Sequence, residues 1–157
     1  MIMHSRIIEL TDEEHPEDEW MCFFDIPEWF YGPIADYAIE SEDRDEDLNW
    51  LRESLEGSAE LEGNKLTFRK DAAVRHFAGR YEAFLKQMAD IQSVTLEEFA
   101  GVSGNFSLQM HTLNSFYNDE FDFYIYHNNS FMTLDEWIRE ADLTHPFFVG
   151  RTFDYHY

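Results

Sequence analysis

The chain has 157 residues, of which 44% are hydrophobic and 28% are charged. Folding can therefore bury roughly two-thirds of the surface that the unfolded chain exposes, which excludes a disordered acidic tail and a membrane protein. The 33 Asp and Glu residues outnumber the 11 Lys and Arg residues, so the formal net charge is −22. Such a charge repels nucleic acids and anionic membranes, and we expect neither as a direct partner.

The single cysteine, Cys22, cannot form an internal disulfide. It lies in the apolar run Trp20–Phe24, which predicts a small buried side chain. The first residues, Met1–Arg6, lack the pattern of a secretory signal, and no uncharged apolar stretch approaches 18 residues. We expect a cytoplasmic protein with a single domain over residues 1–157, because no linker or low-complexity segment interrupts the sequence.

The acidic residues are unevenly distributed along the chain. Residues 1–62 hold 20 acidic and 3 basic residues, residues 63–92 hold 3 and 6, and residues 93–157 hold 10 and 2. The basic stretch coincides with the strongest helical pattern in the sequence. We interpret this helix as the electrostatic counterweight on which the acidic parts assemble.

Two strands and two helices are predicted in the first third of the chain. Arg6–Leu10 and Trp20–Ile26 are rich in β-branched and aromatic residues, which favours a strand pair joined by an acidic turn. Gly32-Pro33 can start a helix that runs to about Ser41. The spacing of Leu48, Leu51 and Leu55 predicts a second helix over Glu46–Glu56.

A hairpin and a long helix are predicted next. Ala59–Lys70 contains Gly63-Asn64, a favoured two-residue turn between short apolar runs. Asp71–Ile91 has an apolar face at helical spacing, which predicts a core helix of about five turns. That face is formed by Val74, Phe77, Tyr81, Phe84, Leu85 and Met88.

Capping signals and alternating patterns define the last third. Thr95 and Thr133 each precede a Glu by three residues, which is typical of a helix start. Apolar residues alternate with polar ones over Phe106–His111 and Phe121–Tyr126, which predicts two paired strands, and Phe147–Tyr157 is a third. We therefore predict an α+β fold: an antiparallel or mixed sheet of about five to seven short strands with one long amphipathic helix and several short helices packed on it.

Metal and cofactor motifs are weak. Asp43, Asp45 and Asp47 alternate as in a calcium-binding loop, but Leu48 stands where the template needs Gly and Ser54 where it needs Glu. We interpret the segment as a solvated loop and leave open whether a divalent ion binds it. The seven histidines are scattered without a zinc motif, and no phosphate-binding loop occurs. We expect no resident metal and no cofactor.

Catalytic motifs are also missing from the sequence. Cys22 has no basic neighbour that would activate a thiolate. The nearest approach to an acid–base cluster is a sheet face around His111, Asp122, Tyr124 and Tyr126, with His127 on the expected neighbouring strand. This face supports an alternative hypothesis, in which the chain is a small enzyme or ligand-binding domain and its acidity serves only solubility.

Several acidic residues are spaced so that they would align in rows along predicted helices. If the helix from Pro33 continued, it would align Asp36, Glu40, Asp43 and Asp47, and a second row would hold Glu53, Glu56 and Glu60. Like charges at this spacing repel, so their repetition calls for a functional reason. The predicted partner-binding residues are Asp36, Glu40, Glu42, Asp43, Asp45, Glu46, Asp47, Trp50, Glu53 and Glu56.

Rows of carboxylates match protein surfaces that hold phosphates. We therefore expect an acidic inhibitor that binds a basic nucleic-acid-handling protein and has no enzymatic activity of its own. One use is DNA mimicry of the antirestriction or anti-CRISPR type, and the other is an immunity protein, or antitoxin, that neutralises a nuclease toxin. The chain is similar to such proteins in size and charge, without a shared motif.

Overall fold

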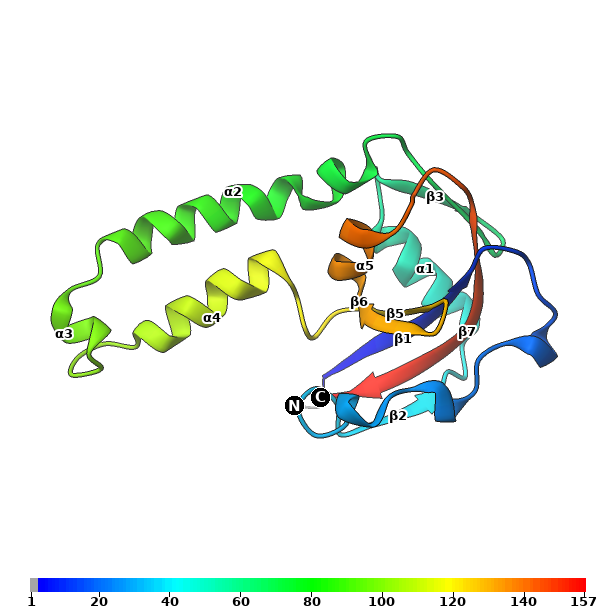
Figure 1. The fold of residues 1–157 in the computed structure, drawn as a ribbon, viewed down its shortest axis with the longest axis horizontal. Coiled ribbons are helices and arrows are strands. Elements are labelled where there is room, and N and C mark those ends of the chain that lie inside the picture. The colour runs from blue at the N-terminus through cyan, green and yellow to red at the C-terminus, as the bar shows by residue number, and fades with distance from the viewer. Residues whose placement is uncertain (1–2) are drawn as a thin grey trace. The chain divides into compact units, whose positions relative to one another are not determined.

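The structure is a computed structural model that describes residues 3–157. The chain forms two compact units, one comprising Met1–His76 and Glu120–Tyr157 and the other Phe77–Asp119. We call them the sheet unit and the helical unit. The first contains a seven-stranded mixed sheet and the second contains helices, so the predicted α+β class is confirmed (Figure 1).

The sheet runs in the order β3-β4-β7-β1-β5-β6, and β2 pairs with β7 outside this path. β1 and β5 are parallel, and all other strand pairs are antiparallel. The strands are β1 His4–Thr11, β2 Tyr37–Glu40, β3 Ala59–Glu62, β4 Lys65–Phe68, β5 Tyr124–His127, β6 Ser130–Thr133 and β7 Phe147–His156. The ten-residue β7 is central because it pairs with β1, β2 and β4.

Residues 3–157 contain five α-helices. They are α1 Arg44–Ser54, α2 Ala72–Gln92, α3 Leu96–Phe99, α4 Phe106–Tyr117 and α5 Leu134–Glu140. α1 and α5 belong to the sheet unit, and α3 and α4 belong to the helical unit. No helix in the described part of the chain has the length and apolar composition needed to cross a membrane.

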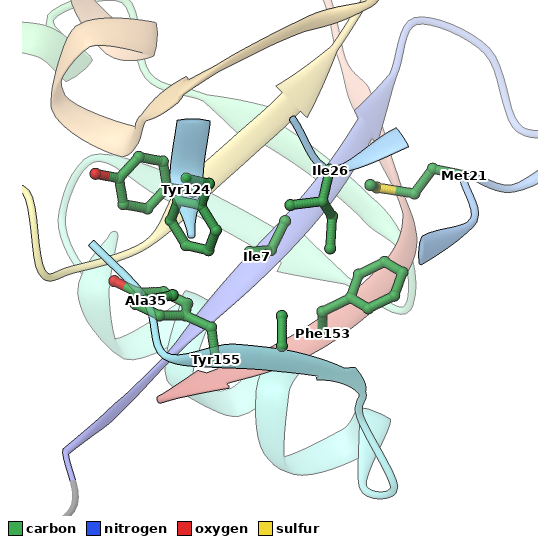
Figure 2. Packing of buried hydrophobic residues seen from close by; sticks show 9 residues of the cluster. Ile7, Met21, Ile26, Ala35, Tyr124, Phe153 and Tyr155 are labelled. Atoms are coloured by element: carbon green, nitrogen blue, oxygen red, sulfur yellow. The ribbon is translucent and has the colours of Figure 1, made fainter. Parts of the chain in front are cut away.

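The sheet has two covered faces. On one face, side chains from β1, β5 and β7 pack against the segment between β1 and β2 (Figure 2). This cluster contains Ile7, Met21, Ile26, Phe30, Ala35, Ala38, Tyr124, Phe153 and Tyr155. Successive strand residues point to opposite faces, so Arg6 and Ile8 face the other way from Ile7. That second face is covered by α1, whose Asp47 contacts Arg6.

Two predicted elements near the N-terminus are wrong. Trp20–Ile26 is not a strand, because the Glu9 carboxylate accepts the Met21 N–H at 2.9 Å and the Asp25 side chain accepts the Cys22 N–H at 2.8 Å. These side chains replace a strand partner and fold the segment into short turns. Cys22 is consequently exposed, contrary to the predicted burial.

The predicted helix from Gly32-Pro33 to Ser41 is also wrong. Tyr37–Glu40 forms β2 and pairs with β7, in register with Phe153–His156. Tyr37 and Ile39 favour extended backbone, and the central strand β7 offers unpaired backbone groups to them. Residues Pro33 to Asp36 turn the chain into the strand, and Gly32 adopts a φ of 95° that favours glycine.

The hairpin and the second helix are confirmed. β3 and β4 pair with Leu61 opposite Leu66, and Gly63-Asn64 forms the turn. α1 covers nearly the predicted residues. It begins two residues early because the Asp43 side chain accepts the Glu46 N–H at 3.0 Å and caps the helix.

α2 matches the predicted long helix in length, but the prediction that its apolar face is core is wrong. Val74 is 75% exposed and Tyr81 61% exposed, and Leu85 and Met88 are exposed as well. The one buried residue of α2 is Ala72. Helical spacing predicted the helix correctly; it could not predict whether another element would cover the stripe.

The predicted strand over Phe106–His111 is wrong, because this segment begins α4. Asn105 caps the helix by accepting the Leu108 N–H at 3.2 Å. The other signals hold in part or in full. Thr95 and Thr133 cap α3 and α5, β7 covers the predicted last strand, and β5 covers the second half of Phe121–Tyr126. β6, which follows the left-handed Asn128-Asn129 turn, was not predicted.

Candidate functional site

A buried ion pair fixes α1 on the sheet. Asp47 is fully buried, and its carboxylate accepts hydrogen bonds from Arg6 Nε on β1 and from Thr152 Oγ1 on β7, the latter at 2.7 Å. The Arg6 guanidinium also contacts Asp154 at 3.0 Å and lies 4.6 Å from the Trp50 ring centroid. These contacts hold the inner side of α1 against the two central strands.

Arg44 anchors the beginning of α1 to the β7 region. Its guanidinium donates to the carbonyl oxygens of Gly150 and Val149, the second at 2.8 Å, and to Asn64 Oδ1 at 2.9 Å. Burial lowers the pKa of Arg44 from its usual value, because desolvation disfavours the charged form. The same guanidinium lies 4.5 Å from the ring centroid of Trp20.

Trp20 lines a small hollow between the acidic segment that follows β1, strand β2 and strand β7. Arg151 also approaches its ring, at 5.4 Å, and pairs with Glu17 at 3.3 Å and Glu40 at 2.6 Å. The hollow measures about 130 Å³, and Glu17, Glu40 and Glu42 are among its lining residues. Segments far apart in sequence thus bring acidic side chains around two arginines.

The outer side of α1 carries a row of carboxylates. Leu48, Leu51 and Leu55 are buried. At about 100° per residue, Glu46 and Glu53 project from the opposite side of the helix and Asp45 from its flank. All three acids are exposed. Residues 3–157 contain no ion pair within 4.0 Å to any of them.

A second hollow continues this row beyond the helix. It measures about 530 Å³ and lies between the end of α1 and the edge strand β3. Four of its lining residues are acidic, namely Glu53, Glu56, Glu60 and Glu62, and two are basic, Arg52 and Arg69. The Arg52 guanidinium bonds to the Asn49 side chain and to the Leu61 carbonyl, so its described bonds neutralise none of these acids.

The predicted partner-binding residues therefore separate into three groups. The predicted helical row from Asp36 to Asp47 does not form. Asp36 directly precedes β2, Glu40 is the last residue of β2, and Asp43 caps α1. Asp47 faces inward and is excluded from any outward surface. The exposed residues that remain together along α1 and its flanks are Glu42, Asp45, Glu46, Trp50, Glu53 and Glu56.

Asp43, Asp45 and Asp47 do not form a calcium-type loop. Asp43 accepts a backbone N–H, Asp45 is exposed in the first helical turn, and Asp47 binds Arg6. Helical geometry directs their side chains to different sides of α1. We define the acidic surface as the exposed acids Asp45, Glu46, Glu53, Glu56, Glu60 and Glu62.

Three bases of the sheet unit, Lys65, Arg69 and Lys70, have no ion pair with the acidic surface in residues 3–157. Arg75 pairs with Asp71 at 2.7 Å, four residues away on the same segment. Within residues 3–157, Lys65, Arg69, Lys70 and Lys86 have no ion pair within 4.0 Å.

The alternative tyrosine and histidine face is not assembled as predicted. His111 lies on α4 in the helical unit, so the predicted pairing of its strand with that of His127 is wrong. Tyr124 is buried, and its hydroxyl donates to the Glu120 carbonyl at 2.9 Å. Tyr126 is partly buried, which raises the pKa of its phenol, and its hydroxyl bonds to Asn129.

A histidine pair that sequence reasoning missed lies at the acidic turn. Asp12 Oδ1 accepts hydrogen bonds from His127 Nε2 and His145 Nε2, both at 3.0 Å. Trp137 Nε1 donates to His127 Nδ1 at 3.1 Å, which places the hydrogen of the neutral ring on Nε2. Bonds from His145 first and His127 second lower the pKa of Asp12. No local motif could have joined residues so distant in sequence.

The acidic surface offers charge and a rigid scaffold, and its described side chains contain no nucleophile–base pair. Closely spaced negative charges of this kind attract a cationic surface. Comparisons with protein-family models, curated proteins and solved structures find no match to this chain.

Proposed function

We propose that the protein inhibits a basic nucleic-acid-handling protein by binding it through the acidic surface. The observation that carries this proposal is the set of exposed, unpaired carboxylates along α1, where Glu46 and Glu53 lie opposite the buried leucines and Asp45 lies on the flank. Such a row costs stability through mutual repulsion and is useful when a cationic partner approaches.

The spacing of the charges supports this choice. Asp45, Glu46 and Glu53 are exposed along α1, and at 1.5 Å per residue they occupy about 12 Å, a mean spacing of about 6 Å. One strand of DNA presents a phosphate about every 3.4 Å. A site that accommodates phosphates therefore meets carboxylates here at roughly half the linear charge density of one DNA strand.

Trp50 supports a docking role at the edge of the same helix. It is 38% exposed, and its ring is held by Arg6 on one side and by an edge contact with Phe123 at 6.3 Å. A fixed aromatic ring beside a charged row can act as an anchor, because little side-chain entropy is lost on binding.

The function is tested with two variants of equal net charge. The first carries Asp45→Lys, Glu46→Lys and Glu53→Lys on α1, and the second carries Glu82→Lys, Asp90→Lys and Glu97→Lys in the helical unit. Both variants and the unmodified chain are assayed against restriction endonucleases, CRISPR effector nucleases and bacterial nuclease toxins. We expect one-to-one inhibition of at least one of these enzymes by the unmodified chain.

Electrostatic steering predicts how the variants differ. At low salt, reversal on α1 should slow association roughly tenfold or more, whereas reversal in the helical unit should have a much smaller effect. Trp50→Ala should speed dissociation. Failure to inhibit any enzyme of the three classes, or equal losses in both charge-reversed variants, would refute the proposal. Competition by duplex DNA distinguishes mimicry of nucleic acid from toxin neutralisation at a separate site.

A further inference from the structure

A histidine and carboxylate cluster lies where the two ends of the chain meet. His4 at the start of β1 is in register with His156 at the end of β7, and Arg6 is in register with Asp154. Asp154 and His156 are two residues apart on one strand and thus share a face of the sheet. Met3 and Tyr157 exchange two backbone hydrogen bonds, at 3.3 and 2.9 Å, which fix the strand ends beside the cluster.

The distances between the ligating atoms match a shared metal ion. One ligand atom from each of His4, Asp154 and His156 lies within 4.8 Å of the other two. His4 Nδ1 is 3.3 Å from Asp154 Oδ1, and His156 Nε2 is 3.7 Å from the same oxygen. Ligands at 2.0–2.1 Å from a tetrahedral zinc ion are about 3.4 Å apart. An ion could therefore bind with only small side-chain movements.

Neighbouring groups orient two of the three ligands. The Tyr37 oxygen is 3.0 Å from His156 Nδ1, and the two rings stack with centroids 4.3 Å apart. When His156 Nδ1–H donates to this oxygen, the Nε2 lone pair is left facing Asp154. Metal-binding histidines usually have such an outer hydrogen bond. Arg6 Nη1 contacts the same Asp154 oxygen, Oδ1, at 3.0 Å and orients the carboxylate.

The cluster is partly buried and open on one side. The side chains of His156 and Asp154 are 13% and 18% exposed, whereas that of His4 is 48% exposed. Three protein ligands with access from solvent leave a coordination position for water. Two imidazoles and one carboxylate favour zinc-like transition metals over Mg²⁺ and Ca²⁺, which prefer oxygen ligands.

We propose that His4, Asp154 and His156 bind one divalent transition-metal ion, with Zn²⁺ as the reference ion and a coordination position open to solvent. The ion joins the first strand to the last strand and therefore stabilises the folded state. The site is separate from the acidic surface, because its ligands lie on β1 and β7 and the surface lies on the outer side of α1 and on β3. Either proposal can fail without the other.

The test uses the full chain without a polyhistidine tag, stripped of metal by a chelator. Zn²⁺ is titrated calorimetrically in excess Mg²⁺, which occupies the exposed carboxylates that bind any divalent ion weakly. Co²⁺ is then titrated while the visible ligand-field absorption is recorded. We expect one Zn²⁺ ion per chain and a Co²⁺ spectrum typical of nitrogen and oxygen ligands. Stoichiometry below one ion, or loss of binding in Mg²⁺, would overturn the proposal.

Variants separate this site from other histidines. His4→Gln, at the exposed ligand, should weaken Zn²⁺ binding at least tenfold, and Tyr37→Phe should weaken it roughly tenfold by removing the outer hydrogen bond. The control is His145→Gln, whose imidazole is similarly exposed and bonds to Asp12. Circular dichroism of each variant checks that the fold is kept. Equal affinity in His4→Gln and the control would refute the assignment of these ligands.

Discussion

The carboxylate of Asp47 on α1 receives the guanidinium of Arg6 on β1, and this pair joins the helix to the sheet beneath it. Both side chains are buried, and Thr152 on β7 supplies a further hydrogen bond to the carboxylate. Asp47 is therefore structural, although it belongs to the most acidic stretch of the chain. Its neighbours Asp45 and Glu46 point outward and are the ones available to a partner.

Removal of the Asp47 carboxylate should destabilise the fold. Asp47→Ala leaves Arg6 buried with one carboxylate contact fewer, and we expect the free energy of unfolding to fall by about 3 kcal/mol. Asp45→Ala on the exposed side of the same helix should change it by less than about 0.5 kcal/mol. Urea denaturation followed by circular dichroism measures both. Similar effects of the two substitutions would contradict the inward orientation of Asp47.

Gly150 should be intolerant of a side chain. A Cβ at this position would lie 2.0 Å from Glu9 Oε1, and the buried Glu9 carboxylate holds the N–H groups of Met21 and Arg151. We expect Gly150→Ala to lower stability by about 2–3 kcal/mol. Gly79→Ala in α2 is the control, because its Cβ would meet nothing within 4 Å. That change should raise stability by up to about 1 kcal/mol, as alanine favours a helix.

The exposed stripe of α2 should contribute little to stability in the isolated chain. Leu85 is 46% exposed, whereas Leu51 of α1 is fully buried. We expect Leu51→Ala to cost about 2–5 kcal/mol and Leu85→Ala to cost less than about 1 kcal/mol. Thermal unfolding of both variants provides the comparison. A large loss from Leu85→Ala would mean that the stripe is core, as its spacing first suggested.

The Asp12 bonds should make stability depend on pH. The hydrogen bonds from His145 and His127 hold the pKa of Asp12 below its unfolded value of 3.8. The ionised form is thus favoured in the folded state, so this stabilisation is present above pH 3.8 and is lost as pH falls through the folded pKa. Because Asp12 is 45% exposed, we expect Asp12→Asn to cost at most about 1 kcal/mol at pH 5.

The same substitution should cost progressively less at lower pH, until the two proteins converge. Denaturant unfolding at a series of pH values from about 5 to about 2.5, which span the ordinary Asp pKa of 3.8, measures the difference in unfolding free energy between the two proteins. Glu13→Gln, on the same exposed turn, controls for the loss of one negative charge. A cost of Asp12→Asn that is independent of pH would contradict the proposed bonds.

Local chemistry explains which elements were predictable. Gly63-Asn64 defined its hairpin and the threonine caps defined their helices, because each signal acts within four residues. The six-residue alternation after Asn105 was too short to distinguish a strand from a helix, and the cap at Asn105 decided for a helix. Tyr37–Glu40 became a strand because β7, more than a hundred residues later, offered a partner.

The acidic surface was predictable in composition and only partly in arrangement. The sequence identified Asp45, Glu46, Glu53 and Glu56 as charges beside Trp50, and the structure places them outward. The sequence could not distinguish Asp47 from these exposed acids, because the burial of Asp47 depends on Arg6 from β1 and Thr152 from β7. Cys22 was misplaced for a related reason, since its apolar neighbours were assumed to form a strand.

Composition determined the net charge, and spacing along the chain determined the α+β class, the long helix and the Gly63-Asn64 hairpin, because these elements depend on interactions between near neighbours. Tertiary structure alone decided which carboxylates point outward, brought His4 to Asp154 and His156, and joined Asp12 to His127 and His145. Those groupings depend on strand pairing between distant segments. Their energies come from contacts that exist only once the sheet has closed.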